Sequence, residues 1–133
     1  MAFSKPTDGE LAILRILWQE KQATVREVND WLNQTRPVGY TTTLKIMQIM
    51  QKKGLLGRKK QGKTHMYHPL ITEKETQGHL LDKLLDSAFG GSAATLVMQA
   101  LGKHRTSPEE LDEIRQLLDQ LDSGTEDDHP QNP

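Results

Sequence analysis

The 133-residue sequence predicts a mainly α-helical protein, in which three helices and a small β-hairpin precede three further helices. Three observations predict this class. Ser or Thr followed three residues later by Glu, the pattern of a helix capping box, recurs where apolar periodicity begins. Apolar residues then repeat at the spacing of a helix face. The period changes once, after Leu55, around a Gln-Gly pair of the kind that forms turns.

Capping boxes predict four of the six helices, over residues 8–20, 25–34, 73–89 and 108–121. The boxes pair Thr7 with Glu10, Thr24 with Glu27, Thr72 with Glu75, and Ser107 with Glu110. Weaker signals predict the other two helices. One opens near Thr41, as its N-cap, and ends at Gly54; a short one opens at Ser92, after a pair of glycines.

The first three predicted helices each have one apolar face, so they can close on a shared core. The faces consist of Leu11, Leu14, Leu17 and Trp18; of Val28, Trp31 and Leu32; and of Leu44, Met47 and Met50. After them, LLGRKK and THMYHP flank Gln61-Gly62 and predict a hairpin, with Met66 and Tyr67 as its packing residues. The sequence thus predicts a first domain over residues 1–70 and a helical domain over 71–121. The acidic, nearly apolar-free tail over 122–133 is expected to be disordered.

The composition excludes several classes of protein. With no cysteine, the chain has no disulfide, no thiolate nucleophile and no cysteine zinc site. No apolar run approaches the roughly 18 residues of a membrane span, and the N-terminus has no apolar signal core, so we expect a cytoplasmic protein. The five histidines lack metal-ligand spacing, and no glycine loop suits a phosphate. No enzyme activity, metal site or cofactor is therefore predicted.

The charges are divided unevenly along a chain whose net charge is only −1. Residues 1–70 carry twelve Lys or Arg against five Asp or Glu, whereas residues 71–133 carry five against thirteen. A basic first half is typical of a protein that binds a polyanion, and the acidic second half should repel the same partner.

The basic character is strongest between Thr41 and Lys63, where seven Lys or Arg occur without one acidic residue. Three helices followed by a basic hairpin are typical of a winged helix-turn-helix, whose third helix enters the major groove of DNA. We expect Thr, Lys and Ile side chains on the outward face of this helix to meet base edges, and four of the other basic side chains to hold phosphates. The first set is Thr41, Thr42, Thr43, Lys45, Ile46 and Ile49, and the second is Lys52, Arg58, Lys60 and Lys63.

Other interpretations of this stretch stay open. A run of charge often only solvates a surface hairpin, and Thr41 can act as a simple helix cap. A winged helix can also serve as a protein–protein assembly module without sequence-specific DNA binding. RNA is disfavoured, because residues 41–63 contain no aromatic side chain on which a base could stack.

The second half predicts a dimer. Its three helices have more apolar surface than about fifty residues bury alone, so a second copy of the chain is expected to cover it. Folding back onto the first domain is the alternative. The residues expected at the dimer interface are Leu80, Leu81, Leu84, Leu85, Phe89, Leu96, Val97, Leu111, Ile114, Leu117, Leu118 and Leu121.

These segments resemble the BlaI/MecI penicillinase-repressor family over about residues 5–121. The resemblance rests on PTDGELAILRILW, TTTLKIMQIMQKKGLL, GKTHMYHP, FGGSAATLVMQAL and SPEELDEIRQLLDQL. It implies a transcriptional repressor that binds a palindromic operator as a homodimer. It also implies base or phosphate contacts by Thr42, Thr43 and Lys45, and backbone contacts by Arg58, Lys60 and Lys63.

Two departures limit what the resemblance carries over. In well-known members of the family a membrane sensor protease cleaves an Asn-Phe bond in the dimerisation region. This sequence has no Asn-Phe pair and has Gln99-Ala100 near the matching place, so that cleavage site is not carried over. Copper-responsive relatives have a cysteine-rich metal motif, which is absent from this chain.

Overall fold

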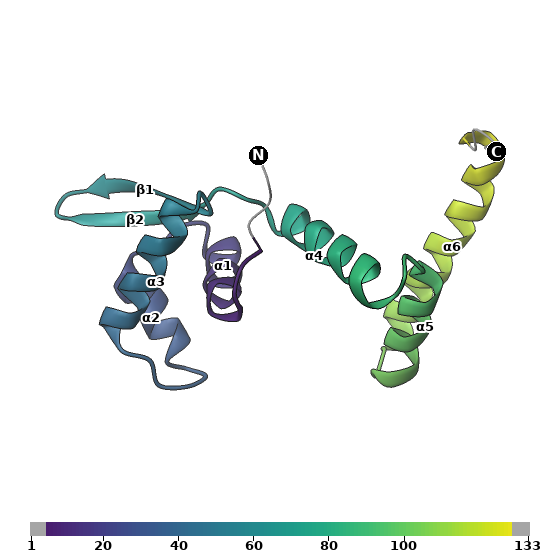
Figure 1. Cartoon of the computed structure of the whole chain (residues 1–133), viewed down its shortest axis with the longest axis horizontal. Coiled ribbons are helices and arrows are strands. Elements are labelled where there is room, and N and C mark those ends of the chain that lie inside the picture. Colours follow the sequence, from purple (N-terminus) through teal and green to yellow (C-terminus); the bar gives the residue numbers. More distant parts are fainter. Residues whose placement is uncertain (1–4, 129–133) are drawn as a thin grey trace. The chain divides into compact units, whose positions relative to one another are not determined.

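The computed structural model describes residues 5–128 and contains six helices and one two-stranded sheet (Figure 1). In chain order these are α1 (Asp8–Glu20), α2 (Val25–Leu32), α3 (Tyr40–Lys52), β1 (Leu56–Gln61), β2 (Thr64–Pro69), α4 (Glu73–Ala88), α5 (Ala93–Lys103) and α6 (Pro108–Asp128). The order confirms the predicted mainly α class with a winged helix-turn-helix. The chain forms two compact units, one up to Leu84 and one from Leu85 on. The domain boundary expected between residues 70 and 71 stays a prediction, to be tested by whether residues 1–70 fold alone.

Local capping chemistry fixes where four of the helices begin, as the sequence predicts. In α1 the Thr7 hydroxyl accepts from the Glu10 N–H at 3.1 Å, and the Glu10 carboxylate accepts from the Thr7 N–H at 3.0 Å. The same reciprocal bonds occur at the starts of α2, α4 and α6. Each box satisfies backbone N–H groups that have no partner within the helix.

The core of the first unit lies where α1, α2, α3 and the hairpin meet. Its fully buried side chains include Ile13, Leu14, Leu17, Val28, Met47, Met50 and Leu56. Tyr67 of β2, at 2% exposure, joins the sheet to this core. The backbone of Tyr67 also exchanges two hydrogen bonds with Ala23, of 2.8 and 3.0 Å, so the hairpin is tied to the connection between α1 and α2. The base of the hairpin is therefore fixed to the three-helix core.

The hairpin turn lies one residue later than the sequence predicts. Gln61 pairs with Thr64 as the last ladder pair, so Gly62 and Lys63 form the turn. Gly62 has a φ of 63°, which glycine adopts without strain, and it stands at the first of the two turn positions. The turn predicted at Gln61-Gly62 is therefore wrong by one residue. The physical reason is that a two-residue hairpin turn prefers glycine at its first position, which Gly62 occupies.

The expectation of disorder over residues 122–133 is wrong for its first part, because α6 continues to Asp128. Residues 129–133 lie outside the described part of the chain. A low content of apolar residues predicts the lack of a core, whereas extending an existing helix requires only one further hydrogen bond per residue. No proline occurs between Pro108 and Pro130 to interrupt that extension.

Candidate nucleic-acid interface

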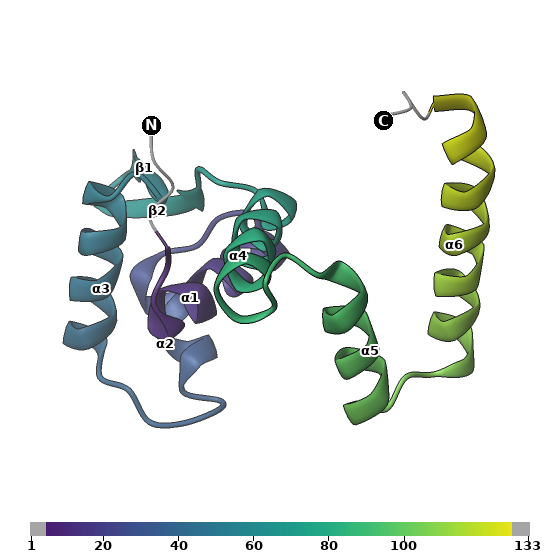
Figure 2. The same ribbon diagram turned by 45° about the vertical axis from the view of Figure 1, so that its right-hand side comes forward.

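Helix α3 lies at the edge of the first unit, with the hairpin running across one of its ends (Figure 2). Its buried line is Thr43, Met47 and Met50, which are spaced as one helix face. The opposite face is exposed and carries hydroxyl, methyl and ammonium groups. The exposed members of the predicted set on this helix are Thr41, Thr42, Lys45, Ile49 and Lys52.

Three details of this helix differ from the sequence-based expectation. Thr43 was expected to face outward, but its exposure is 0%, so it is not available to base edges. Ile46 is half-buried and packs against the core instead of pointing outward. The N-cap is Gly39, and Thr41 lies inside the first turn. Consecutive residues of a helix point about 100° apart, so a shift of one position moves a side chain between the buried and the exposed face. The apolar residues near Leu44 are compatible with either rotation of the helix.

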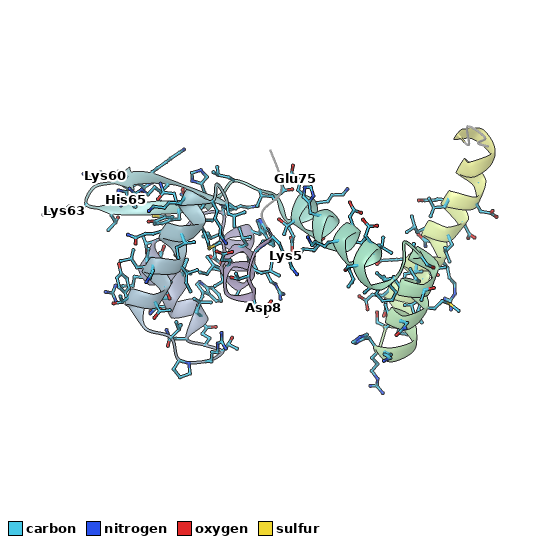
Figure 3. All side chains as sticks on the ribbon, in the orientation of Figure 1. Lys5, Asp8, Lys60, Lys63, His65 and Glu75 are labelled. Atoms are coloured by element: carbon cyan, nitrogen blue, oxygen red, sulfur yellow. The ribbon has the colours of Figure 1, made fainter. Side chains whose placement is uncertain are left out.

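The hairpin presents its basic residues outward. Arg58, Lys59, Lys60 and Lys63 are all exposed, and Lys60 and Lys63 lie at the far end of the hairpin, away from the three helices (Figure 3). Arg58 faces Tyr67 across the ladder, with its Nη1 3.5 Å from the Tyr67 hydroxyl. The hairpin thus forms a cationic arm on a buried tyrosine anchor, which suits binding to a phosphate backbone.

Two basic residues have roles that the sequence did not reveal. Lys53, counted among the seven charges, donates to both carboxylate oxygens of Glu10 at 3.0 and 2.8 Å. Arg26 of α2 lies over the Tyr40 ring, 5.1 Å from its centroid, and adds a cation beside the start of α3. Neither partnership has a local sequence signal, because the partners are separated along the chain and meet only in the fold.

The segment that contains α3 and the hairpin carries only basic charges. Between Asp30 and Glu73 the chain contains eight Lys or Arg and no Asp or Glu. Seven of the eight remain after Lys53 is assigned to Glu10. Such a segment attracts phosphate groups and offers nothing to a cationic partner.

The apolar residues of α4, α5 and α6 are only partly covered within the chain. Leu117, Leu118 and Leu121 on α6 are 52%, 59% and 57% exposed. Leu81, Leu84 and Val97 are also exposed. Leu80, Leu85, Phe89, Leu96, Leu111 and Ile114 are half-buried. These leucines leave apolar surface that the single chain does not cover.

Two other kinds of site find no support within the described residues. No group of three or more His, Asp or Glu side chains, among those that the structure describes, is arranged to hold a metal ion. No helix in that part of the chain is long and apolar enough to cross a membrane.

The sequence of this chain is similar to the sequences of known regulatory proteins. The family model described as penicillinase repressor matches residues 6–120. The regulator BlaI of Mycobacterium tuberculosis is 29% identical over 119 residues, which cover 88% of this chain and 85% of the relative. The penicillinase repressor of Bacillus licheniformis is 25% identical, covering 86% and 89%, and the methicillin resistance regulator MecI of Mammaliicoccus sciuri is 23% identical, covering 84% and 91%.

One solved structure, the DNA-binding domain of the repressor BlaI, is 26% identical, with a TM-score of 0.49, over 56% of this chain and 93% of that one. The family matched by the model consists of transcriptional repressors and not of enzymes. Because the match extends over most of the sequence, the chain belongs to the penicillinase-repressor family, the BlaI/MecI group of winged-helix transcriptional regulators.

Proposed function

We propose that this protein represses transcription by binding a palindromic operator as a homodimer, with α3 in the major groove and the hairpin along the adjacent backbone. The observation that carries the proposal is the absence of acidic residues from α3 and the hairpin, where the helix exposes Thr42 and Lys45 and the hairpin exposes the cationic arm. Hydroxyl and ammonium groups can bond to base edges, and the arm can neutralise phosphates. A repressor of this kind acts on the chromosome, so we expect it in the cytoplasm.

The reading and holding roles fall on different residues. Thr41, Thr42, Lys45 and Ile49 are the proposed reading set, because they are exposed on the outward face of α3. Lys52, Arg58, Lys60 and Lys63 are the proposed phosphate contacts. Thr43 and Ile46, which the sequence placed in the reading set, support the helix from its inner side.

The exposed leucines of the second unit support the dimer. Two copies that share this surface would carry two recognition helices, and paired half-sites multiply a weak single-site affinity. Sedimentation at micromolar concentration should therefore give twice the mass of the 15.1 kDa chain. A single species of one chain mass would contradict the dimer.

The DNA-binding proposal is tested by selecting duplexes from a random pool and measuring the affinity of the selected site at several salt concentrations. Lys45→Ala should change the preferred sequence, whereas Lys60→Ala should weaken binding to every duplex and reduce the salt slope by about 0.9. A winged helix that serves only for protein assembly would select no site and show no steep salt dependence. That result would overturn the repressor proposal.

A membrane sensor protease is a third proposed partner, after the operator DNA and the second copy of the chain, and is carried over from the family. Gln99 and Ala100, near the place of the missing Asn-Phe pair, both lie in α5. A protease must unfold a helical segment to cleave its backbone, so α5 would have to open first. Incubation of the repressor with membranes of induced cells, followed by mass spectrometry of the fragments, would show whether the chain is cut there or elsewhere.

A further inference from the structure

The first turn of α3 is held differently from the first turn of the other helices in the described part of the chain. Helices α1, α2, α4, α5 and α6 each begin with a Ser or Thr hydroxyl that accepts a hydrogen bond from a backbone N–H of the first turn. The N-cap of α3 is Gly39, and α3 has no side-chain cap. Without a cap, the free N–H groups at a helix start are satisfied less well and the first turn frays more readily. The helix proposed to enter the groove therefore needs support from another element.

Asn29 of α2 supplies that support. One end of its side-chain amide lies 2.7 Å from the Thr43 hydroxyl. With Nδ2 at this end, the same nitrogen lies 3.2 Å from the carbonyl oxygens of both Val38 and Gly39, and Oδ1 accepts from Asn33 Nδ2 at 3.3 Å. The opposite orientation would place Oδ1 against two carbonyl oxygens, so the donor side of the amide faces the start of α3.

Asn33 extends the same network through the connection between α2 and α3. Its Nδ2 donates to the Asn29 carbonyl at 2.8 Å and to the Val38 carbonyl at 2.9 Å, and its Oδ1 accepts from the Val38 N–H at 3.1 Å. Residues 33–37 of this connection are exposed, and Val38 is only half-buried. Hydrogen bonds, more than apolar packing, thus fix the path of the chain into α3.

The position of Thr43 makes this network relevant to DNA recognition. Thr43 is 0% exposed, and its hydroxyl bonds to Asn29 on the inner side of α3, while its neighbours Thr42 and Lys45 stand on the exposed side. Any roll or shift of the first turn moves these exposed side chains relative to the base edges. Recognition groups must stay within about 0.5 Å of their productive place, whereas phosphate contacts by long side chains tolerate more.

We propose that Asn29 is a positioning residue for operator recognition, which holds the first turn of α3 in its reading orientation through Thr43 and the carbonyl groups of Val38 and Gly39. The proposal rests on the proposed function of α3 as the reading helix. Asn29 is not assigned a contact with DNA, and its loss should therefore affect the choice of sequence more than the affinity for DNA in general.

The test compares the wild type with Asn29→Ala, Thr43→Val and Thr43→Ser. Val has nearly the shape of Thr without the hydroxyl, and Ser keeps the hydroxyl, so the last variant is the matched control. Each protein is titrated with the operator selected by the wild type and with a scrambled duplex of equal length and composition. Circular dichroism at the titration temperature confirms that each variant is folded.

We expect Asn29→Ala and Thr43→Val to bind the operator about tenfold more weakly, the cost of one misplaced base contact, while their affinity for the scrambled duplex and its salt slope stay unchanged. Thr43→Ser should bind the operator within about twofold of the wild type. An equal loss on both duplexes, or an operator preference that Asn29→Ala retains, would overturn the positioning role alone. A wild type that prefers no sequence would overturn the proposed function and this inference with it.

Discussion

Lys53, the C-cap residue of α3, tests whether a basic residue beside the proposed DNA-binding surface serves the fold instead of the DNA. Its Nζ binds both carboxylate oxygens of Glu10, and the exposed fractions of the two side chains are 32% for Lys53 and 4% for Glu10. Lys53→Met keeps most of the apolar stem but leaves the buried carboxylate without its counter-ion. Breaking a buried pair costs about 3–5 kcal/mol. Because water can reach the Lys53 side of this pair, we expect the free energy of unfolding to fall by about 1–3 kcal/mol.

The assay combines urea unfolding, followed by circular dichroism, with DNA binding to an unrelated duplex at several salt concentrations. Lys52→Met is the matched control, since Lys52 is the exposed neighbouring residue and the last residue of α3. Lys53→Met should lower the unfolding midpoint and keep the salt slope, whereas Lys52→Met should keep the midpoint and reduce the slope by about 0.9. A Lys53→Met protein with the wild-type midpoint and a reduced slope would refute the assignment of Lys53 to Glu10.

Three further predictions concern other parts of the chain. Gly39→Asp should raise the unfolding midpoint slightly, because Gly39 is the N-cap of α3, a Cβ there meets open space, and a carboxylate can cap the helix. The same variant should weaken DNA binding, because the new carboxylate faces the phosphates. A variant in which stability and DNA affinity rise together or fall together would contradict this. The pKa of Glu75 is lowered by the hydrogen bonds from the Thr72 backbone and hydroxyl, so its contribution to stability is present above the ordinary value of 4.5 and is lost as the pH falls through the lower folded value. Unfolding midpoints of the wild type and Glu75→Gln should therefore converge below pH 4.5, and a difference independent of pH would argue against it. Leu118→Asp, at a side chain 59% exposed in the single chain, should keep the helix content but give one chain mass in sedimentation, and a persistent dimer would place the interface elsewhere.

The features that the sequence predicted well depend on neighbouring residues. A capping box places its hydroxyl and its carboxylate three residues apart, so the starts of α1, α2, α4 and α6 could be predicted to the residue. The hairpin was predictable from the change of period, although the turn itself lies one residue later, at Gly62 and Lys63. The outward lysines of the hairpin were equally clear, because a charged side chain on a two-stranded arm has little else to cover it.

The features that the sequence did not predict depend on contacts between separate elements. The rotation of α3 is decided by how Thr43, Met47 and Met50 fit against the other helices, and the threonine-rich start gave no sign that Thr43 would be buried. The partnership of Lys53 with Glu10 spans 43 positions of the sequence. In both cases the sequence alone suggests a free polar side chain, whereas the folded protein buries it or pairs it with another residue.

The separation of charge between the two halves of the chain has a kinetic consequence. A protein with a net charge of −1 gains little attraction toward DNA at distances beyond the Debye length, about 8 Å at physiological ionic strength. Within that distance DNA attracts α3 and the hairpin, which carry no acidic residue, and repels the acidic second half of the chain. The protein therefore approaches DNA in a preferred orientation before it contacts any base. Such a molecule should meet DNA mainly in the productive orientation, and its rate of association should fall as added salt screens this short-range field.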